Sequence, residues 1–259
     1  SGAALEARGA ADAEDVFRAV PGVQFNKGGA DASLLSIRGV GTNTTSENVI
    51  FGQTPTGIYI EDVPFTDPYV YISTPDVAPF DLERVEVLRG PQGALYGASS
   101  LGGAVRYLFN KPDVNATEFS LLGSVNSVSQ GGTGYATYAM ANLPLKQGVA
   151  ALRLVANKRK DPGYIDNLGT GRKDANVVNA EGMRLLLAFK PSTDFDLTAL
   201  YMRERSRQDD GSAISPDPSR LEISTPTAWT VDSVFDLTSL QANLNLGSLR
   251  LTSITGYQT

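Results

Sequence analysis

The side chains that most often carry out chemistry in proteins are scarce in this sequence. It has no histidine and no cysteine, which removes the commonest general base, the reactive thiol and most zinc-type ligand sets. Ser99 and Ser100 lack the GxSxG frame of a hydrolase nucleophile, and residues 97–103 lack the lysine of a phosphate-binding loop. Asp209 and Asp210 stand in a polar, loop-like stretch, where a solvated pair is the simpler interpretation. We therefore expect a protein that is not an enzyme, with no cofactor and no metal site.

Two loop-like stretches offer binding chemistry instead. Tyr69 and Tyr71 are two residues apart, so an extended chain presents both rings on one face, where they can stack on a bulky ligand. Asn43 and Gln53 belong to a second polar stretch, residues 42–53. The alternatives remain open: the tyrosines could pack against a neighbouring wall, and residues 42–53 could be only a connection.

Glycines are concentrated in residues 81–112. Residues 82–88 alternate charged and apolar side chains and stop at Arg89-Gly90-Pro91, which predicts a short strand that runs into a turn. A glycine-rich loop and a second apolar run follow, up to Pro112. Since only glycine lacks a Cβ atom, we expect tight turns and close approach to a neighbouring surface. The glycines concerned are Gly90, Gly93, Gly97, Gly102 and Gly103.

This stretch carries a resemblance to a known family. Residues 85–106, VEVLRGPQGALYGASSLGGAVR, resemble the plug-domain signature of TonB-dependent outer-membrane receptors. Two further segments match upstream in the family's order: residues 15–25 (DVFRAVPGVQF) with residues 35–39 (LSIRG), and residues 57–64 (GIYIEDVP). Three ordered motifs over about a hundred residues make a specific resemblance.

The resemblance implies a fold and a division of the chain. An α+β plug domain, incomplete at its N-terminus, would occupy residues 1–114. The first antiparallel strands of a transmembrane β-barrel would occupy residues 115–259, about seven strands of a barrel of roughly 22. Residues 1–8 show neither a signal peptide nor the family's TonB box, so we expect both to lie outside this sequence.

The resemblance also implies a function. It predicts a receptor of the bacterial outer membrane, in contact with membrane lipid, that takes up a scarce, bulky nutrient, with a ferric siderophore as the first choice. TonB, with ExbB and ExbD, would supply the energy, and we expect a monomer. Alternatives of the same kind are cobalamin or an oligosaccharide as the cargo. A receptor that senses its ligand and transmits a signal is an alternative of a different kind.

Charged side chains around the plug strands are candidates for contacts with the barrel wall. Charges that face a partly wet interface are usually paired or hydrogen-bonded, so such contacts would hold the plug yet break one at a time. The alternative is ordinary solvated surface charge. The six candidates are Arg38, Glu83, Arg84, Glu86, Arg89 and Arg106.

Beyond residue 115 the sequence alternates apolar and polar side chains in segments of strand length. In residues 181–190, Met183 and Leu185 fall on one face and Arg184 on the other, as expected between lipid and a wet interior. Short connections alternate with long polar ones, which is typical of such barrels. A soluble β-sandwich would also alternate, but it explains neither the plug motifs nor the loop lengths. The predicted strands are residues 117–128, 133–145, 149–158, 180–190, 195–207, 234–246 and 249–257.

Composition sets further limits. Lys and Arg number 22 against 28 for Asp and Glu, a net charge of −6, so there is no basic footprint for nucleic acid. No window approaches the run of about 18 apolar residues that a membrane-spanning helix needs. Strands of a membrane barrel alternate in polarity and leave the mean hydropathy, −0.13, unremarkable.

Overall fold

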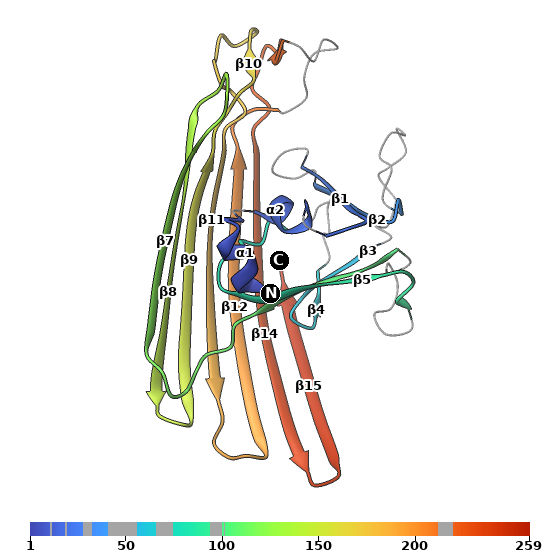
Figure 1. Ribbon diagram of the computed structural model, residues 1–259, viewed down its shortest axis with the longest axis vertical. Coiled ribbons are helices and arrows are strands. Elements are labelled where there is room, and N and C mark those ends of the chain that lie inside the picture. Colours follow the sequence, from blue (N-terminus) through green and yellow to red (C-terminus); the bar gives the residue numbers. More distant parts are fainter. Residues whose placement is uncertain are drawn as a thin grey trace.

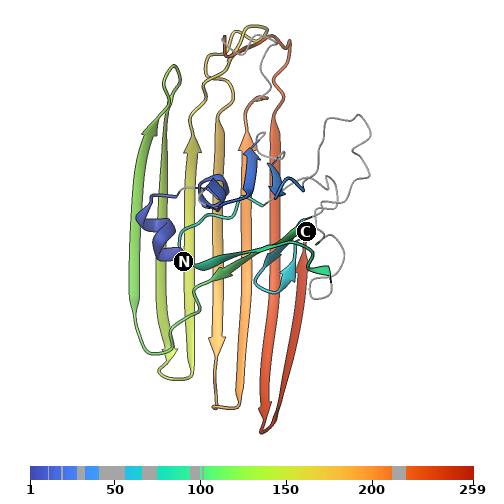
Figure 2. The ribbon, with the colours of Figure 1, turned by 45° about the vertical axis from the view of Figure 1, so that its right-hand side comes forward.

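The chain has two parts of different architecture. The computed structural model describes residues 1–10, 12–18, 20–27, 33–40, 56–65, 75–93, 100, 102–211 and 220–259. Residues 1–109, the N-terminal part, form short helices and small sheets, and the chain beyond them forms one tall antiparallel sheet (Figure 1). Two views agree in placing the N-terminal part against one face of the tall sheet, near mid-height (Figure 2).

The N-terminal part begins with two short helices and a hairpin. These elements are α1 (Gly2–Ala7), α2 (Ala13–Arg18) and the antiparallel pair β1 (Val23–Lys27) and β2 (Ser33–Ile37). The Asp12 carboxylate accepts a hydrogen bond from the Asp15 amide at 3.0 Å. Asp12 therefore caps α2, as its position before an apolar helical pattern predicts.

A four-stranded sheet completes this part, in the order β4-β3-β6-β5. Its strands are β3 (Thr56–Ile60), β4 (Val63–Pro64), β5 (Leu82–Arg89) and β6 (Gly103–Phe109). β3 pairs with β6 in parallel, whereas β5 pairs with β6 antiparallel. The strand, glycine loop and second strand that the sequence predicts in residues 81–112 are thus β5, its following turn and β6.

The tall sheet contains seven strands in sequence order, each antiparallel to its neighbours. All seven were predicted, and their ends differ by at most three residues; β14, for example, starts at Val231 and not at residue 234. The strands are β7 (Glu118–Ser127), β8 (Thr133–Lys146), β9 (Ala150–Asp161), β11 (Val178–Phe189), β12 (Phe195–Gln208), β14 (Val231–Leu246) and β15 (Leu249–Gln258). Among the described residues, no helix is long and apolar enough to cross a membrane.

The connections differ at the two ends of the tall sheet. Residues 147–149, 190–194 and 247–248 are tight turns at the lower end of Figure 1. The described parts of the long connections, residues 162–177, 209–211 and 220–230, gather at the upper end, where β10 (Asp166–Asn167) pairs in parallel with β13 (Glu222–Ile223). The sequence did not reveal these two-residue strands, because they are too short to show any periodicity.

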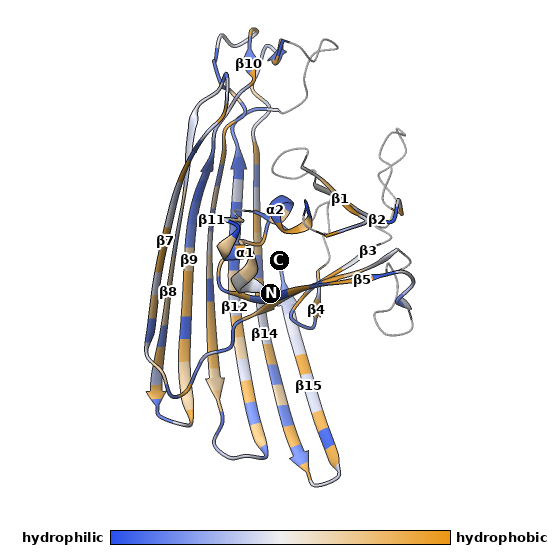
Figure 3. Cartoon of the chain, viewed as in Figure 1, coloured by the Kyte–Doolittle hydropathy of each residue, from blue (hydrophilic) through white to orange (hydrophobic). Residues whose placement is uncertain are grey.

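Polar and apolar residues alternate along the strands of the tall sheet (Figure 3), and exposure alternates with them. Arg184 and Leu186 of β11 point to the N-terminal part and are 1% exposed, whereas Met183 points away and is 42% exposed. The core is shared between the two parts: Phe17 and Tyr107 of the N-terminal part belong to the same buried apolar cluster as Leu186, with further members from β12 and β14. This sharing fixes which face of the sheet is the inner one.

Candidate functional site: the interface between the N-terminal part and the tall sheet

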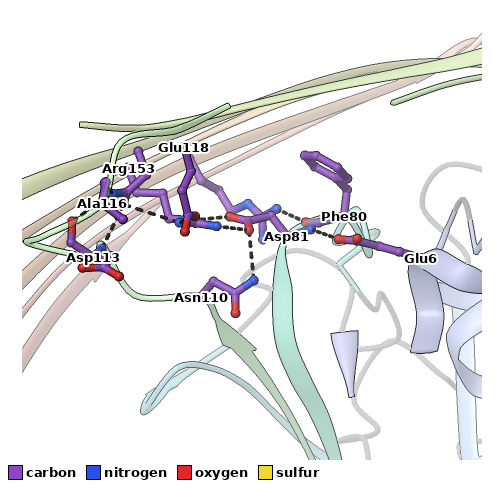
Figure 4. A network of polar contacts seen from close by, with 10 residues as sticks. Glu6, Phe80, Asp81, Asn110, Asp113, Ala116, Glu118 and Arg153 are labelled. Atoms are coloured by element: carbon purple, nitrogen blue, oxygen red, sulfur yellow. Dashed lines mark hydrogen bonds and ion pairs between the residues drawn. The ribbon is translucent and has the colours of Figure 1, made fainter. Parts of the chain in front are cut away.

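A short irregular segment lies between the N-terminal part and the inner face of the tall sheet. This bridging segment, residues 75–81, leads into β5. Arg153 of β9 holds its last residue: the Nη2 and Nε groups donate to the two carboxylate oxygens of Asp81 at 2.6 and 2.9 Å (Figure 4). Both side chains are buried, at 7% and 6% exposure. A two-pronged arginine–carboxylate pair out of water is strong and directional.

Neighbouring groups complete the surroundings of Arg153 and Asp81. Asn110 donates to Asp81 at 2.9 Å, and Arg153 also reaches Glu118 of β7 and Asn142 of β8, each at 3.4 Å (Figure 4). Asp81 itself has a φ of 59°, a backbone conformation that residues other than glycine rarely adopt. The contacts on both sides therefore hold this residue in an unusual geometry.

A second arginine of β9 holds the start of the bridging segment. Arg159, which is 5% exposed, donates to the Asp76 carboxylate and pairs with Asp161 at 2.9 Å. Tyr107 lies buried in the same acidic surroundings: burial raises the pKa of its hydroxyl, and Asp76 and Asp12 raise it further. The phenol therefore stays neutral, and the positive charge here is carried by Arg159.

A third arginine, Arg184 of β11, meets the segment between these two points. It donates to the backbone carbonyl of Phe80, and its guanidinium carbon lies 4.4 Å from the centre of the Phe109 ring. Glu204 approaches from β12 and is hydrogen-bonded to Asn157. The Glu204 carboxylate lies directly over Gly182, where a Cβ atom would be 2.0 Å from an oxygen of Glu204. The missing side chain at Gly182 gives this buried carboxylate its place.

The N-terminal helices contact the same segment from the opposite side. The Glu6 carboxylate of α1 accepts a hydrogen bond from the Asp81 amide at 3.0 Å. The Ala13 amide of α2 donates a hydrogen bond to the Asp76 carboxylate at 3.3 Å. α1 also packs tightly on the start of β5, since a Cβ atom at Gly2 would lie 1.6 Å from the Leu82 carbonyl oxygen. Asp76 and Asp81 are thus each bonded both to an N-terminal helix and to β9.

Sequence comparison decides which family this geometry belongs to. A family profile described as "TonB-dependent Receptor Plug Domain" matches residues 1–104. The chain carries a TonB-dependent receptor plug domain. The seven strands that follow share the fold of barrel strands in a solved receptor structure: the ferric yersiniabactin uptake receptor FyuA of Yersinia pestis superposes on this chain with a TM-score of 0.82. That match covers 98% of this chain and 39% of FyuA, with 23% identical residues.

Relatives known by sequence are receptors of the same family. The pesticin receptor of Yersinia enterocolitica is 28% identical over 189 residues, which are 72% of this chain and 26% of the relative. The iron-regulated outer membrane virulence protein of Vibrio cholerae is 35% identical over 108 residues, 41% of this chain and 16% of the relative. The chain therefore spans 16% to 39% of the length of these similar proteins. The outer membrane is named for the Vibrio cholerae relative and for the ferripyoverdine receptor of Pseudomonas aeruginosa, so the chain is similar to part of an outer-membrane receptor.

The plug meets β14 and β15 through apolar contacts. Val63 of β4 lies against Gly256 of β15, where a Cβ atom would be 2.7 Å from a Val63 methyl carbon. Phe65 packs edge to face on Phe235 of β14, with the ring centres 5.0 Å apart. Glu61, at the turn before β4, keeps its charge satisfied within the plug by Lys111 and by the Phe109 amide at 2.8 Å.

The six charged residues predicted as plug–barrel contacts have their described contacts inside the plug. Arg106 donates to Glu86 at 2.9 Å and to Asp62, and Arg84 pairs with Glu83 and Glu86. The Arg84 hydrogen bond, and then Arg106, hold the pKa of Glu86 below its usual value even though burial acts in the opposite direction.

The remaining two of these six residues, Arg89 and Arg38, lie where the plug's own elements meet. Arg89 donates to the Pro21 carbonyl at 3.2 Å. Arg38 is exposed and has a φ of 54°. A role for the six as plug–barrel anchors stays a prediction. Polar contacts with the described barrel strands are made by Asp76, Phe80 and Asp81, which the sequence did not single out.

Two of the plug signature glycines have the geometry that was predicted. Gly103 has a φ of 149°, and a Cβ atom there would lie 2.3 Å from the Leu88 carbonyl oxygen, so β6 can approach β5 only with glycine at this point. Gly90, with a φ of 98°, makes the turn after β5, and its amide donates to Gly102 at 3.1 Å. A Cβ atom at Gly93 would meet no described atom within 4 Å, and Gly97 lies outside the described residues.

The predicted ligand-binding residues fall in two stretches of the plug. Asn43, Gln53, Tyr69 and Tyr71 lie outside the described residues, so their role stays a prediction.

The long barrel loops are described in part, and they are bonded to each other. Asn167 of one loop donates to Asp210 of the other at 2.7 Å, and burial of Asp210 is outweighed by this bond and by the Trp229 and Gly211 amides, which hold its pKa below the usual value.

Proposed function

We propose that the full-length receptor takes up a ferric siderophore across the outer membrane, driven by TonB. The observation that carries the transport part is the plug domain seated on the inner face of barrel strands by a few discrete polar bonds. Iron as the cargo is supported by the names of similar proteins, a ferric yersiniabactin uptake receptor and an iron-regulated outer-membrane protein. The receptor binds and moves its cargo and transforms nothing chemically.

The mechanism we propose uses the plug as a gate. TonB, together with ExbB and ExbD, would draw on the chain that precedes the plug, since the outer membrane has no supply of ATP. In this chain that pull would reach α1 and α2 first, and both are bonded to the bridging segment through single hydrogen bonds of 3.0 and 3.3 Å. Such bonds break one by one at modest cost, whereas the buried arginine pairs resist.

Ligand contact is proposed for the plug residues Asn43, Gln53, Tyr69 and Tyr71. Their residue types suit a bulky, oxygen-rich chelate, because amides donate hydrogen bonds and tyrosine rings stack while their hydroxyls bond. Replacing Tyr69 and Tyr71 by Ala should weaken binding of the ferric siderophore by about tenfold or more at unchanged receptor abundance. Unaltered affinity would instead support the interpretation that the two rings pack against the wall.

Uptake by a strain that lacks its own outer-membrane receptors tests the function. The full-length gene would be supplied, and labelled ferric siderophores, among them ferric yersiniabactin, would be offered beside cobalamin and a maltooligosaccharide, with and without TonB. We expect accumulation of a ferric siderophore that depends on TonB. Accumulation of cobalamin or the oligosaccharide alone would overturn the proposed cargo, and TonB-independent accumulation would overturn the proposed mechanism.

A further inference from the structure

The outer face of the barrel strands changes character toward the long loops. On β12, the side chains that point outward are apolar from Phe195 to Tyr201 and then become Arg203, Arg205 and Arg207. The same change occurs on β9, where outward-pointing Leu154 and Ala156 are followed by Lys158 and Lys160. The upper ends of β9 and β12 are accordingly coloured hydrophilic in Figure 3.

Strand register brings these cations side by side. Lys158, Glu181 and Arg205 form one row across β9, β11 and β12, and Lys160, Asn179 and Arg207 form the next. Neighbouring strands are about 4.8 Å apart, so each row places two cations roughly 10 Å from each other. We call the five residues Lys158, Lys160, Arg203, Arg205 and Arg207 the outer cationic band.

The charge of this band is only partly balanced. Arg205 forms a two-pronged pair with Asp232 at 2.7 and 3.0 Å, and Arg203 pairs with Asp236 at 3.4 Å. Arg207 lies 3.6 Å from Asp209, and Glu181 stands between Lys158 and Arg205 in their row. Within the described part of the chain, Lys158 and Lys160 form no ion pair. Five cations thus face four carboxylates at this height, and the two lysines carry the charge that no ion pair offsets, although the whole chain carries −6.

The height of the band corresponds to lipid headgroups. From Phe195 to Arg203 the chain advances eight residues, about 27 Å along the strand, or roughly 20 Å along the membrane normal at the usual tilt. The apolar girdle of an outer-membrane barrel is about 25 Å tall. Because long loops mark the extracellular end, the band lies at the headgroups of the outer leaflet.

We propose that the outer cationic band is a binding site for phosphorylated headgroups of outer-leaflet lipid, namely the phosphates of lipopolysaccharide. Ammonium groups without a protein partner attract a phosphate as point charges, and half-exposed arginines offer N–H groups beyond those bonded to Asp232 and Asp236. The apolar side chains directly below the band would contact the acyl chains of the same lipid. One lipid molecule would thus satisfy both the charge and the apolar surface of this face.

Lipid retention by the purified full-length receptor tests the site. The receptor would be extracted in mild detergent and titrated with lipid A carrying its phosphates and with dephosphorylated lipid A. We expect the double variant K158Q/K160Q to bind phosphorylated lipid A roughly 30-fold more weakly than the wild type, at about fivefold for each lysine. Dephosphorylated lipid A should bind equally weakly to both proteins.

A matched variant separates this site from a general effect of charge. K146Q/K190Q removes the same two charges near the tight turns at the opposite end of the strands, and we expect it to bind phosphorylated lipid A like the wild type. Equal binding by wild type and K158Q/K160Q would overturn the proposal. A preference of the band for glycerophospholipid, or a dimer that K158Q/K160Q dissociates, would assign the face to a different occupant and overturn it as well.

Discussion

The plug is attached to the barrel strands in two different ways on its two sides. Toward β9 and β11 the polar contacts are made by arginines: Arg153, Arg159 and Arg184 each hold one point of the bridging segment. They lie beside an apolar contact, in which Phe80 stacks on Tyr138 of β8. We call this the ionic side. Toward β14 and β15 the contacts are apolar, with Val63 on Gly256 and Phe65 on Phe235. The first kind of contact is directional and fails abruptly when a partner is lost, whereas the second tolerates small sliding.

This difference suggests how a gate can be both tight and movable. Buried ion pairs contribute little net stability over an apolar substitute. Removing one partner, however, leaves the other charge buried without a counter-charge. They therefore define position more than they add free energy. We infer that the ionic side sets where the plug sits, and that the apolar side supplies an interface along which it can shift.

The largest expected effect is on the ionic side, at Arg153. In the full-length receptor, R153M would leave the buried Asp81 carboxylate unpaired, at a cost of about 3–5 kcal/mol. Amide hydrogen exchange of residues 76–82 should then accelerate by roughly a hundredfold or more. R203M is the matched control, since its pair with Asp236 is 49% exposed on the arginine side and is worth about 0–1 kcal/mol. Equal effects of the two variants would contradict a special role for the buried pair.

A second, smaller effect is expected at Arg184. R184M removes the bond to the Phe80 carbonyl and leaves the Glu204 carboxylate without its nearby cation, which should destabilise the barrel-bound plug by about 2–4 kcal/mol. Adding E204Q should recover part of this loss, because the stranded charge is removed with its partner. Chemical denaturation of the full-length receptor measures both. Strictly additive losses in the double variant would show that the two side chains act independently.

The apolar side should respond to size and not to charge. G256A places a methyl group 2.7 Å from Val63 and should cost about 1–3 kcal/mol through overpacking. The compensating variant G256A/V63A should recover most of the loss. Exchange of the β3 and β4 amides should report the change while residues 76–81 stay as slow as in the wild type. Faster amide exchange of the bridging segment in G256A would show that the two sides of the interface respond as one unit.

The smallest expected effect is on pH dependence within the plug. The folded pKa of Glu86 lies below its ordinary value of 4.5, held there chiefly by Arg84. Its contribution is therefore present above the unfolded pKa and is lost as the pH falls through the folded value, below about 4.5. Lowering the pH from 5 to 3 should reduce the protection of the β5 and β6 amides, measured relative to their intrinsic exchange rate at each pH, slightly more in the wild type than in E86Q. Identical pH profiles of the two proteins would show that Glu86 does not contribute to this pH dependence.

Much of the barrel could be predicted from the sequence because its environment is simple. Lipid on one face and the plug on the other impose opposite demands on alternate residues, so both the strands and the inward direction of Arg153 and Arg184 follow from the alternation. The plug motifs likewise predicted strands β5 and β6 and the tight backbone geometry at Gly103. Neither signal says which carboxylate an inward arginine will meet.

The partners could not be predicted because they are distant and lie in irregular backbone. Asp81 is 72 residues from Arg153, and Asp76 is 83 residues from Arg159. The bridging segment has no period that would mark it, whereas Arg84, Glu86 and Arg106 were conspicuous because they stand in the signature strands. Those conspicuous charges are bonded within the plug, so closeness in sequence to a motif was a poor guide to the described interface.

Amide hydrogen exchange across the plug of the full-length receptor, in wild type, R153M and D81N/R153M, tests the central claim most directly. If the ionic side positions the plug, residues 76–82 exchange far faster in R153M, the double variant restores part of their protection, and the β3 and β4 amides are unaffected in both. Uniform acceleration throughout the plug, or no change at residues 76–82, would contradict the division of the interface into an ionic and an apolar side.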